Sequence, residues 1–173
     1  MITKKMLRGS ASTLALFVAL ALGGPVLAQD HGLIFLVRHG EKVSEAEDAP
    51  LNPAGKKRAQ CLAQTLRDAN IHAIYVTDVA RTQQMAAPLA KALHLEPIII
   101  PKKNISGLVQ TLKQARRQNI LVVNHWDTLP DIFEQLGVEE IKFDYSEFDR
   151  LFIVSLAGGG HPSLTALHYC GTP

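Results

Sequence analysis

The sequence contains little cysteine, and its two cysteines, Cys61 and Cys170, stand in no CxxC or metal-ligand spacing. A redox or metal centre built from closely spaced cysteines is therefore excluded. In an oxidising compartment the two could close a disulfide between the first helix and the C-terminal tail. The alternative, two separate buried thiols, is equally compatible with the sequence.

The chain of 173 residues also lacks a strong charge excess, internal repeats and low-complexity segments. Its formal charge of +2 becomes −1 once the three cations of residues 1–28 are set aside. No basic balance therefore points to a nucleic acid or an anionic membrane as a partner. With 47% apolar and 20% charged residues, the composition is that of a globular protein about one domain long.

Residues 1–28 follow the three-part pattern of a secretory signal peptide. Three cations within 1–8 precede an apolar run over 14–22, and small residues at Val26 and Ala28 match a cleavage site. The run is well short of the ~20 residues that span a bilayer, and no later segment is long enough. We expect a signal peptide over 1–28, one domain over 29–173, and a periplasmic or secreted bacterial protein without a membrane anchor after cleavage. An uncleaved N-terminal anchor is the alternative, and the sequence indicates no oligomeric state.

Apolar patterns of two periods alternate along residues 29–173. Strand patterns occur at 33–37, 71–77, 97–101, 120–123, 151–156 and 164–168, and helix patterns at 53–69, 79–93, 106–118 and 129–136. Asn52 and Asp78 are the expected N-caps of the first two helices, and prolines on both sides of 97–101 favour a sheet edge. The alternation predicts an α/β fold, a three-layer α/β/α sandwich with a mostly parallel central sheet and a C-terminal hairpin.

Cations and imidazoles follow three of the predicted strands. Arg38 and His39 end the first strand, Arg81 follows the second, and His125 follows the fourth. Ligands of open α/β sheets gather at the carboxyl ends of strands, so these side chains are expected to meet there. Each residue alone is unremarkable, as a surface arginine or a structural histidine. Together they predict a pocket for a dianionic phosphoryl group, because guanidinium groups match phosphate oxygens.

Four segments in order resemble the histidine phosphatase superfamily, in its phosphoglycerate mutase-like branch. They are Arg-His-Gly-Glu at 38–41, Pro-Leu-Asn-Pro-Ala-Gly at 50–55, Arg-Thr-Gln-Gln-Met-Ala at 81–86 and Asn-His-Trp-Asp-Thr-Leu-Pro at 124–130. The resemblance implies a phosphoglycerate mutase-like fold and a small phosphorylated substrate. It implies that His39 attacks phosphorus, Arg38 and Arg81 hold phosphoryl oxygens, and His125 donates to them. No metal or other cofactor is expected, since the arginines supply the positive charge.

The chain departs from the family pattern beside the second histidine. Asn124 replaces a glycine and Trp126 replaces a small residue. Trp126 is expected either to contact the substrate at the pocket or to pack into the core. The general acid is open, with Glu41 and Asp127 as the two candidates. A site without an acid would suit a good leaving group.

We therefore expect a metal-independent phosphatase that hydrolyses a phosphomonoester, or a similar phosphorylated compound, through a phosphohistidine on His39. One alternative is a phosphotransferase of the mutase type, which needs a longer cap to retain its intermediate. A second is a binding protein that kept the arginine pocket without catalysis. A third is a domain that shares only the fold.

Overall fold

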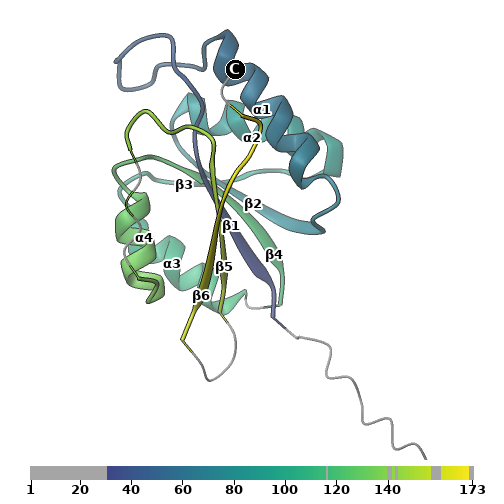
Figure 1. Cartoon of the computed structure of the whole chain (residues 1–173), viewed down its shortest axis with the longest axis vertical. Helices are drawn as coiled ribbons and strands as arrows, with labels where there is room; N and C mark the ends of the chain where they lie inside the picture. The colour runs from purple at the N-terminus through teal and green to yellow at the C-terminus, as the bar shows by residue number, and fades with distance from the viewer. Residues whose placement is uncertain (1–30, 116, 140–141, 143, 157–160, 172–173) are drawn as a thin grey trace, which may run out of the picture.

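A six-stranded sheet organises the computed structural model, which describes residues 31–115, 117–139, 142, 144–156 and 161–171 (Figure 1). The strands are β1 (Leu33–Arg38), β2 (Ile71–Thr77), β3 (Ile98–Ile100), β4 (Asn119–Asn124), β5 (Arg150–Ser155) and β6 (Ser163–His168). They lie in the order β3-β2-β4-β1-β5-β6. The expected signal peptide and the turn of the expected hairpin, 157–160, lie outside the described residues.

The sheet is mixed, with a parallel part and an antiparallel edge. Strands β3, β2, β4 and β1 are parallel, whereas β5 pairs antiparallel with β1, and β6 with β5. The mostly parallel sheet is confirmed, as are the C-terminal strand pair and the edge position of β3. Because β2, β4 and β1 are neighbours, their carboxyl ends lie side by side.

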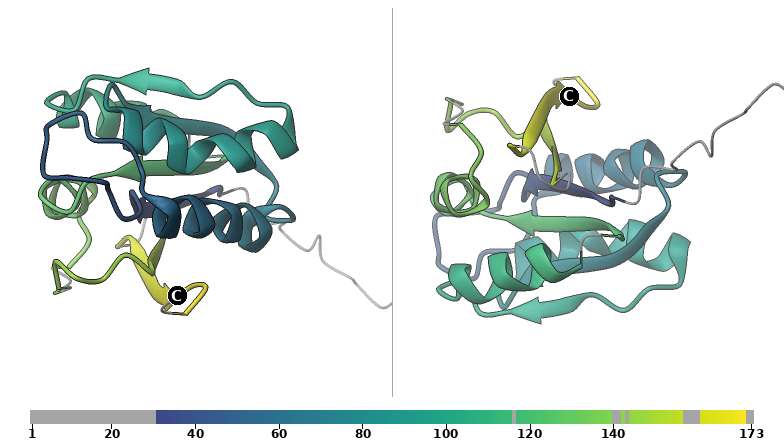
Figure 2. Two further views of the ribbon diagram at one scale, coloured as in Figure 1. Left: turned by 90° about the horizontal axis from the view of Figure 1, so that it is seen from above. Right: turned by 90° about the horizontal axis from the view of Figure 1, so that it is seen from below.

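Four helices cover the described sheet, two on each face (Figure 2). They are α1 (Pro53–Leu66), α2 (Ala80–Leu93), α3 (Ile105–Gln114) and α4 (Leu129–Leu136). Strand β1 is apolar from Leu33 to Val37 because it is buried on both sides. Phe35 and Val37 pack with α1 and α2, and Ile34 and Leu36 pack with α3 and α4. Within the described part of the chain, none of these helices has the length and apolarity needed to cross a bilayer.

One of the two expected N-caps is correct. Asn52 caps α1, because its Oδ1 accepts from the backbone N–H of Gly55 at 2.9 Å. The expectation for α2 was wrong, since Val79 occupies the N-cap position without a side-chain hydrogen bond. Asp78 instead accepts from the backbone N–H of Lys102 at 3.0 Å, so it positions the turn after β3.

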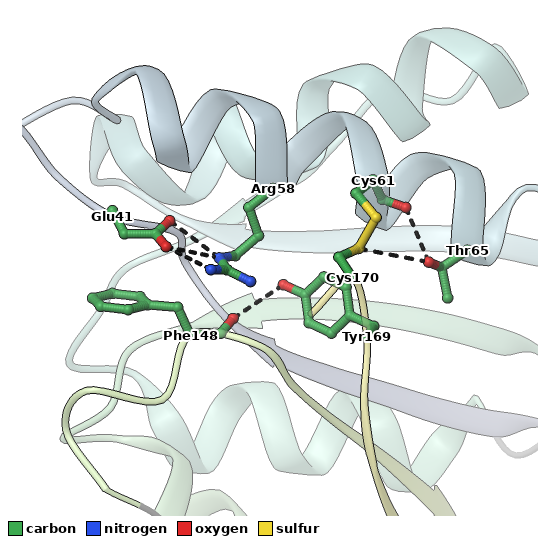
Figure 3. Close-up of a disulfide and its surroundings, with 7 residues drawn as sticks. All are labelled: Glu41, Arg58, Cys61, Thr65, Phe148, Tyr169 and Cys170. Carbon is green, nitrogen blue, oxygen red and sulfur yellow. Dashed lines mark hydrogen bonds and ion pairs between the residues drawn. A yellow bond between two sulfur atoms is a disulfide. The ribbon is translucent and has the colours of Figure 1, made fainter. Parts of the chain in front are cut away.

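Cys61 and Cys170 form a disulfide, which decides between the two alternatives left open by the sequence (Figure 3). Their Cα atoms are 6.1 Å apart across a sequence separation of 109 residues. The bond joins α1 to the segment that follows β6. Tyr169, the residue before Cys170, is buried at 4% exposure, so the last described turn packs against the domain rather than trailing from it.

Removing this disulfide is expected to destabilise the fold by on the order of 2–5 kcal/mol, because the long closed loop restricts the unfolded chain. Urea unfolding of the oxidised protein with and without reductant measures the difference. The double variant Cys61→Ser/Cys170→Ser is the control, and it should unfold like the reduced protein and ignore the reductant. Equal midpoints for all samples would contradict the expectation.

Candidate functional site

A pocket of about 210 Å³ opens at the carboxyl ends of β1, β2 and β4. It brings together the four residues that the strand ends predicted: Arg38, His39, Arg81 and His125. These four side chains are all buried, with exposures between 2% and 7%. The remaining lining residues are Lys42, Lys102, Trp126, Asp127 and Tyr145.

His39 is held as a neutral imidazole with a defined tautomer. Its Nδ1 lies 2.7 Å from the carbonyl oxygen of Gly40, and since a carbonyl only accepts, Nδ1 carries the proton and Nε2 carries the lone pair. Burial lowers the pKa of His39 to about 4; the bond to Gly40 opposes the shift, and the charges of Arg81 and Arg38 add to it. His39 is therefore unprotonated at Nε2 near neutral pH, as a nucleophile must be.

Gly40 allows the loop after β1 to pass against the start of α1. A Cβ at this position would lie 2.9 Å from the Cα of Gly55, closer than backbone atoms tolerate. A side chain at Gly40 would push α1 away or rotate the carbonyl that holds His39. The glycine of the Arg-His-Gly segment thus fixes the tautomer of its neighbour.

Three arginines are buried near the pocket, and only one has a carboxylate partner among the described residues. Arg58 pairs with Glu41, with Nη2 at 2.6 Å from Oε1 (Figure 3). Arg38 and Arg81 form no ion pair within the described part of the chain, and the Nε of each is buried without a hydrogen-bond partner there. Two uncompensated positive charges therefore lie beside His39.

Neutral groups hold these two arginines in place. The guanidinium of Arg38 donates to the carbonyl oxygen of Tyr145, and its Cζ lies 3.9 Å from the ring centroid of Phe148. Arg81 donates from Nη1 to the carbonyl oxygen of Glu47 at 2.5 Å. Burial lowers the pKa of Arg38 despite these contacts. Carbonyls and aromatic faces orient the cations without cancelling their charge.

His125 is oriented by a chain of hydroxyl groups with one possible direction. Thr82 Oγ1 lies 2.9 Å from the carbonyl oxygen of Val79 and donates to it, so it accepts from Thr77 Oγ1, also at 2.9 Å. Thr77 Oγ1 then accepts from Nε2–H of His125 at 2.9 Å. Nδ1 of His125 is left as the acceptor for Arg81 Nη2, 3.3 Å away. Burial lowers the pKa of His125 to about 3, with His39 and Arg81 adding to the effect.

The side chain of Asn124, which stands where the family pattern has glycine, builds the turn that carries His125. Its Oδ1 accepts from the backbone N–H of His125 at 3.0 Å and from Thr128 Oγ1 at 2.8 Å. Its own carbonyl oxygen accepts from the backbone N–H of His39 at 3.0 Å. The asparagine side chain therefore supports the turn that carries His125, and the backbone of the same residue connects this turn to the His39 loop.

The two candidate acids lie in different places. Glu41 is absent from the pocket lining and faces Arg58. Burial alone would raise the pKa of its carboxyl, but the hydrogen bond and the charge of Arg58 lower this pKa. Asp127 lines the pocket mouth and pairs with Lys102 at 2.9 Å. Burial opposes the ionisation of Asp127 too, but Lys102 again lowers its pKa. Neither carboxyl holds a proton near neutral pH.

The pocket mouth contains aromatic residues. Trp126 is 39% exposed and lines the pocket, so of its two expected positions the structure selects the one at the site. The sequence analysis missed Tyr145, Phe148, Thr77 and Thr82. The aromatic residues lie in an irregular segment with no periodic signal, and only the predicted proximity of Arg81 and His125 could have drawn attention to the two threonines. No group of three or more metal-ligating side chains occurs among the described residues.

Known proteins share part of this sequence and most of its fold. Residues 34–103 match the model of the histidine phosphatase superfamily (branch 1). This match supports the superfamily resemblance that the four sequence segments indicate. The matched residues include Arg38, His39 and Arg81, whereas His125 comes from the part of the chain beyond them. "Probable phosphoglycerate mutase GpmB" of Yersinia enterocolitica serotype O:8 is 38% identical over 76 residues, covering 40% of this chain and 35% of that protein. The match thus spans about a third of the length of such curated relatives.

Solved structures of proteins named as phosphatases share the fold of this chain. The protein histidine phosphatase SixA, complexed with tungstate, has a TM-score of 0.65 at 18% identity, covering 79% of this chain and 96% of that one. Phosphoserine phosphatase of Entamoeba histolytica, complexed with 3-phosphoglyceric acid, has a TM-score of 0.65 at 20% identity, and the alignment covers 82% of this chain and 98% of that one. At these identities the likeness shows the fold alone.

We expect both site histidines to stay neutral well below pH 6.5. Because burial lowers both pKa values, protonation should occur at about pH 4 for His39 and about pH 3 for His125, with Nδ1–H on the first and Nε2–H on the second. Long-range ¹H–¹⁵N NMR of the imidazole rings measures tautomer and midpoint directly. The unfolded chain takes up these protons first, so stability should fall as pH falls from about 6.5 towards 4. A midpoint near 6.5 for either ring would contradict the assignment.

Thr82→Val is expected to disturb His125 through the hydroxyl chain. It removes the acceptor of Thr77 in a fully buried position, which should cost about 1–3 kcal/mol of stability. The substitution should also allow the neutral ring of His125 to carry its proton on Nδ1 instead of Nε2, and the same NMR measurement detects this change. Thr82→Ser keeps the hydroxyl and should retain the tautomer. A valine variant that is destabilised but keeps the His125 tautomer would assign Thr82 a purely structural role.

Proposed function

We propose that this protein is a metal-independent phosphatase that hydrolyses a phosphorylated small molecule through a phosphohistidine on His39. One observation carries the proposal: two buried guanidinium charges without carboxylate partners in the described site lie beside an unprotonated imidazole nitrogen. Burying an unpaired charge costs several kcal/mol. A phosphoryl group offers the matching negative charge, and Arg38 and Arg81 present forked donors to it.

The reaction begins at Nε2 of His39. Its lone pair forms a bond to phosphorus, the bond from phosphorus to the leaving oxygen breaks, and the leaving group departs with that electron pair. Arg38 and Arg81 hold the non-bridging oxygens while charge develops on them. The ring becomes cationic on phosphorylation, and the carbonyl of Gly40 accepts its Nδ1–H throughout.

His125 assists when the phosphoryl group arrives. In the structure its Nδ1 accepts from Arg81, so it is not the ready donor that the family pattern implied. A bound dianion raises the pKa of a neighbouring imidazole, which favours protonation of Nδ1 and a charged hydrogen bond to a phosphoryl oxygen. Water then attacks phosphorus, the bond to Nε2 breaks, and inorganic phosphate leaves neutral His39 behind.

A phosphatase is favoured over a mutase by the extent of the similarities. The chain covers nearly the whole length of solved proteins named as phosphatases, and about a third of the curated mutases. The loop between α2 and β3 is also short, so it supplies no large cap to retain an intermediate.

We also propose export to an oxidising compartment, periplasmic or outside the cell, with cleavage of residues 1–28. The disulfide supports this proposal, because such bonds persist where thiols are not kept reduced.

His39→Ala is expected to lower phosphatase turnover by roughly 10⁴-fold or more, because the nucleophile is lost. Mature protein is assayed with p-nitrophenyl phosphate in the presence of a chelator. Intact-mass spectrometry after a rapid quench should find an acid-labile phosphoryl group on the wild type alone. His72→Ala, an exposed histidine on β2, is the matched control and should leave turnover intact.

Turnover that survives in His39→Ala would contradict the proposed nucleophile. If the wild type turns over no ester but still binds phosphate, the protein is a phospho-ligand binding protein and the phosphatase proposal fails.

A further inference from the structure

The mouth of the pocket presents two aromatic rings to solvent. Trp126 is 39% exposed and Tyr145 is 49% exposed, and both line the pocket. Their ring centroids are 5.5 Å apart with the planes at 79°, so they form an edge-to-face pair. The guanidinium Cζ of Arg38 lies 4.5 Å from the Tyr145 ring centroid. The apolar wall therefore begins where the phosphate-holding cation ends.

No carboxyl group among the described residues of this mouth is free to donate a proton to a leaving group. Asp127 is the one carboxylate among the described lining residues, and Lys102 holds it in an ion pair at 2.9 Å. Glu41 is engaged by Arg58 outside the lining. A leaving alkoxide without an acid is slowed by ~10²–10⁴-fold, because general acid catalysis typically contributes that much.

From the aromatic mouth and the pairing of the only carboxylate among its described lining residues, we infer that the site acts on aryl phosphomonoesters, in which phosphate is joined to a phenolic oxygen. This inference rests on the proposed function and specifies its leaving group. A phenol has a pKa of about 10, as in tyrosine, so phenolate departs without a proton donor. Its ring would lie against Trp126 and Tyr145 as the phosphate reaches Arg38 and Arg81.

The reaction balances with water alone. His39 Nε2 bonds to phosphorus as the P–O(aryl) bond breaks, and phenolate leaves with the electron pair. Water supplies the oxygen of inorganic phosphate as the P–N bond breaks. One of its protons finally neutralises the phenolate, and His39 returns to its neutral form.

Three esters separate leaving-group chemistry from ring contact: phenyl, benzyl and propyl phosphate. Benzyl phosphate keeps the ring but has an alkoxide leaving group, and propyl phosphate has neither advantage. We expect kcat/KM for phenyl phosphate to exceed that for benzyl phosphate by roughly 100-fold or more. We expect kcat/KM for benzyl phosphate to exceed that for propyl phosphate by about 3- to 10-fold, because the benzyl ring contacts the aromatic pair. O-phosphotyrosine, free and within a short peptide, shows whether the aryl ester is taken as a small molecule or from a protein.

Trp126→Ala is the decisive variant. It should lower kcat/KM for phenyl and benzyl phosphate by about 3- to 10-fold relative to propyl phosphate, and Trp126→Phe should restore most of the loss. Leu167→Ala removes an equally exposed apolar side chain on β6 and should leave every ratio unchanged. Circular dichroism checks that each variant is folded.

Two outcomes would overturn the inference while the proposed function stands. In the first, Trp126→Ala lowers kcat/KM for all three esters by the same factor, which would mean that the ring contact does not select the leaving group. In the second, Asp127→Asn lowers kcat/KM for benzyl and propyl phosphate but not for phenyl phosphate, which would make Asp127 a general acid that serves alkyl esters. Loss of all turnover by the wild type, or its survival in His39→Ala, would instead be a failure of the proposed function.

Discussion

The site depends on burying two guanidinium groups without giving them carboxylates. Arg38 and Arg81 are 3% and 7% exposed, and in the described structure their partners are carbonyl oxygens, aromatic faces and an imidazole. Desolvating an unpaired cation costs several kcal/mol, so the surrounding fold must stabilise this arrangement. That cost has a use, because donors already fixed in position need no reorganisation when negative charge develops on a bound group.

The neighbouring Arg58 is a buried arginine that does have a carboxylate partner. It is as deeply buried, but Glu41 receives it through three hydrogen bonds, which ties the loop after β1 to α1 (Figure 3). The disulfide at Cys61 lies on the same helix, one turn further on, and binds it to the C-terminal segment. Tyr169 of that segment donates to the carbonyl of Phe148, whose ring lies over Arg38. The structural arginine and the disulfide thus support the loop and the aromatic face that orient the site.

Much of the fold followed from local patterns. Strand patterns of four to seven residues with turn signals marked the strands, and helical spacing marked all four described helices. The site residues at strand ends were also predictable, since a charged or imidazole side chain interrupts an apolar run there. The segment that carries Tyr145 and Phe148 was not predictable, because it has no period and reaches Arg38 only through the pairing of β5 with β1. The expected N-cap of α2 was wrong because the side chain of Asp78 accepts instead from the backbone N–H of Lys102, in the loop after β3.

The sequence by itself determined the element order, the strand ends and the identity of the four convergent residues, because periodicity and strand ends are local properties. Tertiary structure decided the rest. It directed Glu41 to Arg58, closed the disulfide, turned Trp126 towards the pocket and assigned the proton of His125 through Thr77 and Thr82. Each of these depends on a partner from another element, and the sheet order β2-β4-β1 decides which partners meet.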